Sequence, residues 1–218
     1  MSTVKSESTR ERILFAAAEV LSRKGFSATR LGEIATTAEL RAPAVYYYFA
    51  SRHDLISEVM AVGQARLREH VVGVLDELPA DTDPMDRICA AAAAHLEVEL
   101  ELSHFATAVT RNTGQLPDDI RARLREDSHA YSRLWRELIE SAHEAGQIRA
   151  DLDRRAAIKL IMGALNWTPE WWDRSQGSLT DLIVTTQSII RHGLGPVPAA
   201  VPVCPQFDSD FSTNERLL

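Results

Sequence analysis

The sequence predicts an all-α protein of about nine helices, on the strength of three observations. Apolar residues recur at steps of three and four through most of the chain, which places them on one face of a helix. Residues that start or stop helices, chiefly Ser, Asp, Pro and Gly, stand at the ends of these periodic stretches. We find no alternating pattern of apolar and polar residues and no hairpin turn signal, which argues against a β-sheet.

The first part of the chain divides into four helical stretches. Ser8 and Glu11 have the spacing of a capping box, and Gly25 stops the first periodic run. Pro43 suits the first turn of a later helix, where its missing N–H costs nothing. Ser51 is placed to cap a long helix. The predicted helices cover residues 9–24, about 29–37, 42–49 and about 51–78.

The second half of the chain continues as helices separated by Gly and Pro. Gly114 and Pro117 separate two of them, and Gly146 ends the long helix that follows. Pro169 predicts a kink or an early end in the next helix, because proline cannot donate an N–H. We expect a disordered tail over residues 194–218, which are rich in proline and end in a polar run. The predicted helices cover residues 83–102, 103–113, 117–145, 153–172 and 178–192.

Composition bounds the class of protein and its compartment. The chain has 218 residues, of which 45% are hydrophobic and 25% charged, as in soluble globular proteins. No apolar run approaches the roughly 20 residues of a membrane span, and the first residues contain no apolar secretory segment. Cys89 and Cys204 are too few and too far apart for a disulfide framework or a cysteine zinc site. We therefore expect a cytoplasmic protein that contacts no membrane and has no metal and no cofactor.

Charge is distributed unevenly along the chain. The formal net charge is −7, which by itself argues against nucleic acid as a partner. Residues 1–56, however, hold eight Lys and Arg against six Asp and Glu, so this segment has a net charge of +2 and the remainder −9. Such asymmetry is typical of a small polyanion-binding module attached to an acidic body. A chance excess of two charges is the alternative explanation.

Two short helices with a four-residue turn between them form a candidate helix-turn-helix. The turn is Ala38–Arg41, and in proteins that use this motif the second helix enters the major groove of DNA. Val45 and Phe49 are four residues apart and are expected to pack on the other helices. Small residues at the start of the second helix let its backbone approach base edges. The residues expected to face DNA are Thr29, Arg30, Arg41, Ala42, Pro43, Ala44, Tyr46, Tyr47, Tyr48 and Arg52.

Tyr46, Tyr47 and Tyr48 argue against a purely buried role for this aromatic run. Three consecutive side chains point in three directions around a helix, so they cannot all be buried. Their hydroxyls can donate hydrogen bonds to phosphate oxygens. The helix that begins after Ser51 also offers free N–H groups to a phosphate.

Several motifs, in order, resemble the N-terminal domain of the TetR family of transcriptional regulators. They are Arg12-Ile13-Leu14 followed by Ala16-Ala17, then Gly25-Phe26, Thr29, Ile34-Ala35, and the run from Ala42 to Leu55. The resemblance implies a repressor that dimerises through its last two helices, binds a palindromic operator and releases it when a small molecule binds. It implies a three-helix helix-turn-helix DNA-binding domain at residues 1–56 and a helical effector-binding and dimerisation domain at residues 57–193.

The chain departs from the family pattern at four positions of this motif. Glu39 stands where the family usually has Gly, and it carries strain if the position needs a positive φ. Arg41 replaces the usual Ser, which loses a helix cap but offers an arm toward DNA. Tyr48 and Arg52 replace the usual His and Lys, and both keep a group that can bind phosphate.

The larger domain is expected to hold the effector pocket, and it contains all four tryptophans. Core and dimer packing is the alternative role of these rings. Asn166 lies on an otherwise apolar helical stretch and needs a buried partner or a ligand. The stretch 163–174 is similar to that of family members that sense acyl-coenzyme A thioesters, so the expected effector is a hydrophobic or aromatic acid or such a thioester. The expected ligand-binding residues are His104, Phe105, Arg111, Tyr131, Trp135, Asn166, Trp167 and Trp171, and the expected dimer contacts are Ile161, Leu165, Ile183 and Ile190.

Two other functions remain open from the sequence. Glu101/His104 and Glu140/His143 have a Glu-x-x-His spacing, which can hold two metal ions in the core of a helical-bundle enzyme. Charged residues at this spacing more often form a solvated helix face, so we expect no catalytic residues. An architectural DNA-binding protein without an effector would explain the helix-turn-helix, but not a large second domain rich in tryptophan.

Overall fold

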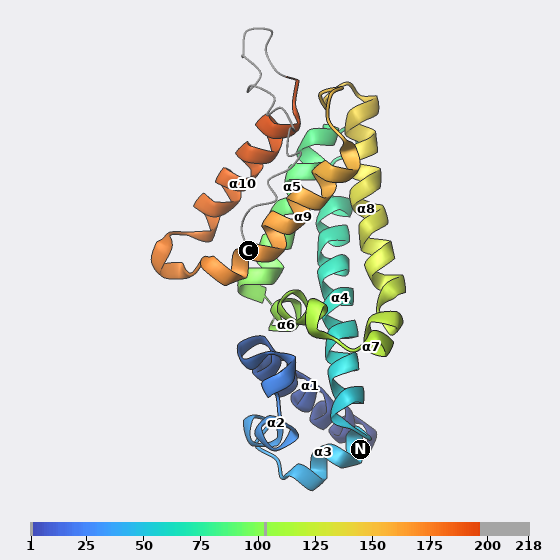
Figure 1. Ribbon diagram of the computed structural model, residues 1–218, viewed down its shortest axis with the longest axis vertical. Coiled ribbons are helices and arrows are strands. Elements are labelled where there is room, and N and C mark those ends of the chain that lie inside the picture. Colours follow the sequence, from blue (N-terminus) through green and yellow to red (C-terminus); the bar gives the residue numbers. More distant parts are fainter. Residues whose placement is uncertain (1, 103, 197–218) are drawn as a thin grey trace, which may run out of the picture.

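The computed structural model describes residues 2–102 and 104–196, so most of the predicted tail lies outside the described residues. Within this part of the chain, the structure contains ten α-helices, short 3₁₀ and π-helical segments and no strands (Figure 1). The predicted all-α fold is confirmed.

Helix α1 (Ser2–Ala28) begins earlier than predicted and contains one break. The chain is already helical at Ser2, so Ser8 lies inside the helix and the predicted capping box there is wrong. Gly25 has a φ of 77°, a conformation that glycine adopts without the steric penalty of a Cβ. The regular part of α1 therefore ends at the glycine that the sequence indicates.

Helices α2 (Leu31–Thr37) and α3 (Ala42–Tyr48) are the two short helices of the helix-turn-helix. They pack against α1 around a small apolar core, in which Ile13, Ile34 and Val45 are fully buried. Burying each of these side chains contributes roughly 1.5–3 kcal/mol to folding. Phe49 is also buried, as its spacing from Val45 predicts.

Helix α4 (Arg52–Glu77) joins the helix-turn-helix to the rest of the molecule. Ser51 caps its first turn, because the serine hydroxyl accepts a hydrogen bond from the Asp54 backbone N–H over 3.0 Å. At 1.5 Å per residue α4 spans about 39 Å. Figure 1 shows it running from α1–α3 up to α5 and α8.

Two helices predicted as continuous are interrupted in the structure. Helix α5 (Pro84–Glu97) passes into a π-helical turn (Val98–Leu102) before α6 (His104–Asn112) begins. Helices α7 (Asp118–Arg123) and α8 (Arg125–Glu144) replace the single helix predicted over 117–145, and a 3₁₀ turn (Thr113–Gln115) precedes them.

The break between α7 and α8 lies where the chain changes from one core to another. Ile120 and Leu124 are buried in the core of the helix-turn-helix unit, whereas Trp135 is buried in the core of the larger domain. The spacing of apolar residues in the sequence does not show that the residues before and after Leu124 belong to different cores.

The last two helices lie along one side of the molecule. Asp153 caps α9 (Arg154–Trp171), and Ser178 caps α10 (Leu179–Leu194), with a 3₁₀ turn (Arg174–Gln176) between the two. Pro169 lies in the last turn of α9, which ends two residues later. Helix α10 packs chiefly on α5 (Figure 1).

Helix α6 belongs to both cores. Phe105 and Ala108 are buried with α1–α4, while Ala106 of the same helix is buried in the larger domain. A Cβ at Gly63 of α4 would lie 2.5 Å from the Phe105 carbonyl oxygen and 2.6 Å from a methyl of Val109, so the glycine permits this close contact. The predicted domain boundary at residue 56 therefore falls within α4 and within a shared core.

We predict that Gly63→Ala lowers the free energy of unfolding by about 1–3 kcal/mol, because α4 and α6 must separate to admit the methyl group. Gly73→Ala is the matched control in the same helix, since a Cβ there meets nothing within 4 Å and should raise stability by up to ~1 kcal/mol. Urea unfolding followed by circular dichroism measures both changes. Equal stability of the two variants would contradict the prediction.

Candidate nucleic-acid interface and effector domain

The turn between α2 and α3 contains a strained residue. Glu39 has a φ of 54°, the only positive value among the non-glycine residues that the structure describes. A side chain costs roughly 1–2 kcal/mol in this left-handed region. The Leu40 N–H donates to the Ala35 carbonyl oxygen over 2.8 Å and closes the turn. The resemblance places a glycine at position 39 in the family, and the geometry gives the physical reason for that preference.

The start of α3 has no side-chain cap. Arg41 is the N-cap residue with extended backbone, and its side chain makes no capping hydrogen bond. Pro43 occupies the first turn without breaking the helix. Arg41 and Pro43 are exposed, and Ala42 and Ala44 are partly exposed.

The three tyrosines of α3 are distributed around the helix. Tyr46 is 57% exposed and Tyr47 82% exposed, whereas Tyr48 is half-buried and packs edge-on against the Tyr47 ring at 5.1 Å. Two tyrosine side chains are therefore on the surface beside Arg41. Arg30, at the N-cap of α2, is also exposed.

Arg52 lies beneath the motif. Its Nε donates to the Thr29 carbonyl oxygen over 2.7 Å, its guanidinium also donates to the Phe26 carbonyl oxygen, and the group lies 4.4 Å from the centre of the Phe26 ring. Burial lowers the pKa of Arg52. Arg52 therefore ties the end of α1 to the start of α4, and the geometry does not favour the predicted phosphate contact.

Thr29 is also structural. Its side chain is 2% exposed, and its hydroxyl donates to the Gly25 carbonyl oxygen over 2.7 Å. The Thr29 backbone N–H donates to the same carbonyl oxygen over 3.2 Å, so Thr29 closes the end of α1 through both groups. The Thr29 side chain is therefore not available to DNA in this structure.

Helix α6 connects the helix-turn-helix unit to the larger domain through Asn112. This side chain is fully buried, and its Oδ1 accepts from the Phe26 backbone N–H over 2.6 Å. Its Nδ2 donates to the Leu21 and Ala108 carbonyl oxygens at 3.3 Å and 2.8 Å. The side-chain amide of Asn112 on α6 thus hydrogen-bonds two backbone groups at the broken end of α1.

Arg111 makes a second link from α6. Its guanidinium donates to the Ser22 carbonyl oxygen of α1 over 2.9 Å and to the Pro169 carbonyl oxygen of α9 over 2.8 Å. It also pairs with Glu170 at 2.5 Å. Arg111 therefore joins three helices, and its donors are not directed to a ligand pocket as predicted.

Other predicted pocket residues also lie elsewhere. Phe105 is buried in the core shared with α1, edge-on to Phe15 at 5.2 Å. His104 is exposed at the start of α6. Trp167 is 66% exposed on α9, whereas Trp171 is 49% exposed and lines an apolar groove between α9 and α10. The spacing of residues in the sequence predicts which face of its helix a side chain lies on. It does not predict which other helix packs against that face.

Tyr131, Trp135 and Asn166 are the predicted pocket residues that the structure brings toward one another. Trp135 is fully buried, and its ring meets Tyr131 edge-on at 6.4 Å. The Tyr131 hydroxyl hydrogen-bonds His95 Nδ1 over 2.9 Å, and Asn166 lies close enough to His95 to affect its pKa. His95 of α5 was not predicted from the sequence, because a lone histidine in an Ala-rich stretch gives no signal.

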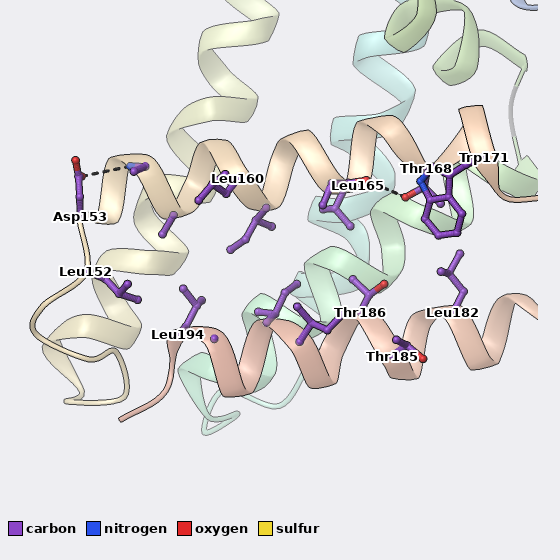
Figure 2. A pocket seen from close by; sticks show the side chains of 17 residues that line it. Leu152, Asp153, Leu160, Leu165, Thr168, Trp171, Leu182, Thr185, Thr186 and Leu194 are labelled. Carbon is purple, nitrogen blue, oxygen red and sulfur yellow. Dashed lines mark hydrogen bonds between the residues drawn. The ribbon is translucent and has the colours of Figure 1, made fainter. Parts of the chain in front are cut away.

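An apolar groove of about 510 Å³ lies between α9 and α10 (Figure 2). Leu160 and Ile189 line it and are 74% and 68% exposed. Of the four predicted dimer contacts, Ile161, Leu165 and Ile190 line the groove, whereas Ile183 lies outside it. Leu165 and Ile190 are already buried within the chain, so the exposed neighbours supply the free apolar surface.

The Glu-x-x-His pairs do not form a metal centre. Glu101 pairs with Arg174 at 2.8 Å, and Glu140 pairs with Arg154 at 3.1 Å. Among the described residues, no group of three His, Cys, Asp or Glu side chains is placed to hold a metal ion. None of the described helices is both long enough and apolar enough to cross a membrane.

A helix-turn-helix with exposed tyrosines on its second helix, joined by one long helix to a helical domain, defines a DNA-binding transcriptional regulator. The chain belongs to the TetR family of bacterial regulatory proteins. The model of that family's N-terminal domain matches residues 13–59, and the tetracyclin repressor-like C-terminal domain matches residues 81–189.

Curated relatives and solved structures agree with this assignment. The fatty acid metabolism regulator protein of Bacillus subtilis (strain 168) is 18% identical over 180 residues, covering 83% of this chain and 91% of the relative. The transcriptional repressor KstR2 of Mycobacterium tuberculosis is 25% identical over 175 residues, covering 79% and 85%. The structure of AibR in complex with isovaleryl coenzyme A and operator DNA has a TM-score of 0.74 at 20% identity, covering 86% of this chain and 98% of that chain.

We predict that Asn112→Ala lowers the free energy of unfolding by about 1–3 kcal/mol, because it removes a fully buried amide and leaves the part-buried Phe26 N–H without its acceptor. Gln115→Ala, an exposed position three residues away, is the control and should change stability by less than ~0.5 kcal/mol. Chemical denaturation measures both values. Hydrogen exchange should also quicken at the end of α1 in Asn112→Ala alone, and unchanged exchange there would contradict the link.

Proposed function

We propose that this chain is a cytoplasmic homodimeric repressor that binds a palindromic operator and releases it when a small hydrophobic or aromatic effector binds the larger domain. One observation carries this proposal. Helix α3, which carries exposed tyrosines, lies at one end of the molecule, and α9 and α10, which line the apolar groove, lie in the other half (Figure 1). One end suits DNA, and the other suits a second copy of the chain.

The α3 surface suits a DNA groove for electrostatic and steric reasons. Arg41 is exposed at the N-terminus of the helix, where the first backbone N–H groups lack helical partners. Pro43 and its small neighbours keep the helix end narrow. Tyr46 and Tyr47 extend from the same helix and can donate to phosphate oxygens.

We predict that Arg41→Ala weakens operator binding and reduces the salt slope by about one, because each phosphate neutralised by a cation contributes about −0.9. Tyr46→Phe should weaken binding without changing the slope, since its hydroxyl is uncharged. Fluorescence anisotropy at several salt concentrations, on an operator selected from random duplexes, measures both. Arg136→Ala on α8 is the charge-matched control. Wild-type affinity and slope in Arg41→Ala would refute the contact.

The groove between α9 and α10 suits a second copy of the chain. It is apolar and open, and its exposed side chains come from two neighbouring helices, as Figure 2 shows. A two-fold arrangement of these helices would bury Leu160 and Ile189 from both copies. It would also hold two α3 helices about one DNA turn, ~34–36 Å, apart.

We predict that Leu160→Glu converts the dimer to a monomer at micromolar concentration, because a carboxylate cannot be buried there without a partner. Lys159→Glu changes charge at the preceding exposed position, outside the groove, and is the control. Light scattering after size-exclusion chromatography gives the mass of each variant. A monomeric wild-type chain, or a dimeric Leu160→Glu variant, would exclude this interface.

The effector class is suggested by the relatives. AibR is described with isovaleryl coenzyme A, and another structural neighbour is a fatty acid degradation regulator from Bacillus halodurans. In this chain, a groove of about 730 Å³ between α8 and α9 is lined by four arginines, Arg133, Arg136, Arg154 and Arg155, and by three acids, Glu137, Glu140 and Asp153. The arginines outnumber the acids, so this groove is our candidate site for the phosphates of an acyl-coenzyme A. An acyl-coenzyme A thioester is therefore our first candidate effector.

A further inference from the structure

The guanidinium of Arg111 lies where α6 meets both α1 and α9 (Figure 1). Its Nη1 donates to the Ser22 carbonyl oxygen of α1 over 2.9 Å, and its Nη2 donates to the Pro169 carbonyl oxygen of α9 over 2.8 Å. Its Nε donates to Glu170 Oε1, also on α9, over 2.5 Å. One side chain therefore bonds the first helix of the DNA-binding unit and a helix of the larger domain at the same time.

Both backbone acceptors of Arg111 lie at the C-terminal end of a helix. Ser22 lies three residues before the break at Gly25, and Pro169 lies two residues before the end of α9 at Trp171. Carbonyls in a last turn lack a regular donor within their own helix, and the negative end of the helix dipole stabilises a cation. The last turn of α9 contains no basic residue of its own. Arg111 therefore caps two helices that are far apart in the sequence.

The part of α9 that Arg111 holds adjoins the proposed dimer interface. Thr168 and Trp171 line the apolar groove between α9 and α10, and they are the residues immediately before Pro169 and after Glu170. Figure 2 shows both near one end of the groove. The bonds of Arg111 therefore join the surface that suits a second copy of the chain to the helix-turn-helix unit.

The other end of this link lies at the base of the DNA-binding unit. Ser22 is 5% exposed, so its bond to Arg111 is made beneath the surface of α1. Helix α1 shares one core with α2 and α3, in which Ile34 and Val45 are fully buried. Because close-packed side chains transmit displacements, α3 moves with α1. The position of Ser22 relative to Pro169 consequently sets the position of α3 relative to α9.

Stability alone is a weak reason for this arrangement. The side chains of Arg111 and Glu170 are 33% and 34% exposed, and partly exposed ion pairs contribute little to the free energy of unfolding. The planar guanidinium presents its donors in fixed directions, which a flexible lysine amino group does not. What the three bonds fix is the relative placement of α1 and α9.

We propose that Arg111 is a positioning residue for operator binding, because it holds α1 against the end of α9 and so fixes the distance and angle between the two α3 helices of the dimer. The inference rests on the proposed function, since it requires a dimer through α9 and α10 and an operator with two half-sites. A dimer gains affinity from the second half-site only if both DNA-binding helices match the spacing. Without Arg111, each DNA-binding unit moves more freely relative to the dimer interface.

The test measures how strictly the dimer reads the spacing between half-sites. The probes are an operator selected from random duplexes by the wild-type chain, the same operator with one base pair inserted between its half-sites, and a duplex with one half-site. One inserted base pair moves the half-sites apart by about 3.4 Å and rotates them by about 34°. We expect the insertion to weaken binding of the wild-type dimer at least about tenfold, because both units cannot then engage together.

Variants at two matched arginines assign the effect. Arg111→Ala should bind the selected operator about tenfold more weakly, bind the half-site as the wild type does, and lose less than about threefold on the insertion. Arg111→Lys keeps the charge but cannot bond all three acceptors, so it should behave like Arg111→Ala. Arg149→Ala is the control, since the Arg149 side chain is 28% exposed and pairs only two residues away with Asp151. Fluorescence anisotropy measures each affinity.

Spin labels measure the same restraint without DNA. Thr36→Cys at an exposed position of α2, combined with Cys204→Ser, places one label on each copy, because Cys89 is buried. Double electron–electron resonance should give a narrow distribution of distances between the labels when Arg111 is present. The distribution should broaden in Arg111→Ala and stay narrow in Arg149→Ala.

The outcomes separate a positioning role from a merely structural one. Equal weakening on the operator and the half-site, an unchanged loss on the insertion, wild-type behaviour of Arg111→Lys, or an unchanged width of the distance distribution would each overturn the proposal. Light scattering gives the mass of every variant. A wild-type chain that is monomeric, or that selects no duplex with two half-sites, would refute the proposed function and this inference with it.

Discussion

The close packing of α6 against both α1 and α4 is the constraint on which the rest of the structure depends. Gly63 gives α4 the smooth surface that the Phe105 backbone requires, and Phe105 then completes a core made mainly by the helix-turn-helix unit. The DNA-binding unit consequently has no core of its own that ends at a domain boundary. Its shape depends on a helix that also packs in the core of the larger domain, through Ala106.

Local chemistry explains why so much of the fold could be predicted from the sequence. The spacing of Val45 and Phe49 indicated their burial, and Ser51 indicated the start of α4. These signals act within one or two helical turns, where the sequence and the geometry coincide. The predicted start of the first helix and the predicted single helix over 117–145 were wrong. Helix α1 runs through the apparent cap at Ser8, and the chain breaks at Leu124, which is buried in the core of the helix-turn-helix unit.

The candidate site was less predictable because its partners are far apart in the chain. Arg111 is 89 residues from Ser22 and 58 from Pro169, so no spacing in the sequence indicates either bond. Arg52 looked like a phosphate ligand because it is basic and close to the motif, yet two backbone carbonyls use its donors. Exposed Arg41 and Tyr46 remain candidates, since nothing within the described residues gives their side chains another role.

The same distribution of contacts gives the proposed regulation a physical route. Thr110 and Arg111 are consecutive residues of α6, and one bonds Glu99 while the other bonds Ser22 of α1. Asn112 follows them and closes the broken end of α1 at Phe26. Thr110, Arg111 and Asn112 therefore connect the π-helical turn of the larger domain to α1, which packs against α2. Packed cores shift between discrete arrangements and do not deform continuously. Under the proposed regulation, a displacement of α6 would therefore move α1 and the helices that pack on it.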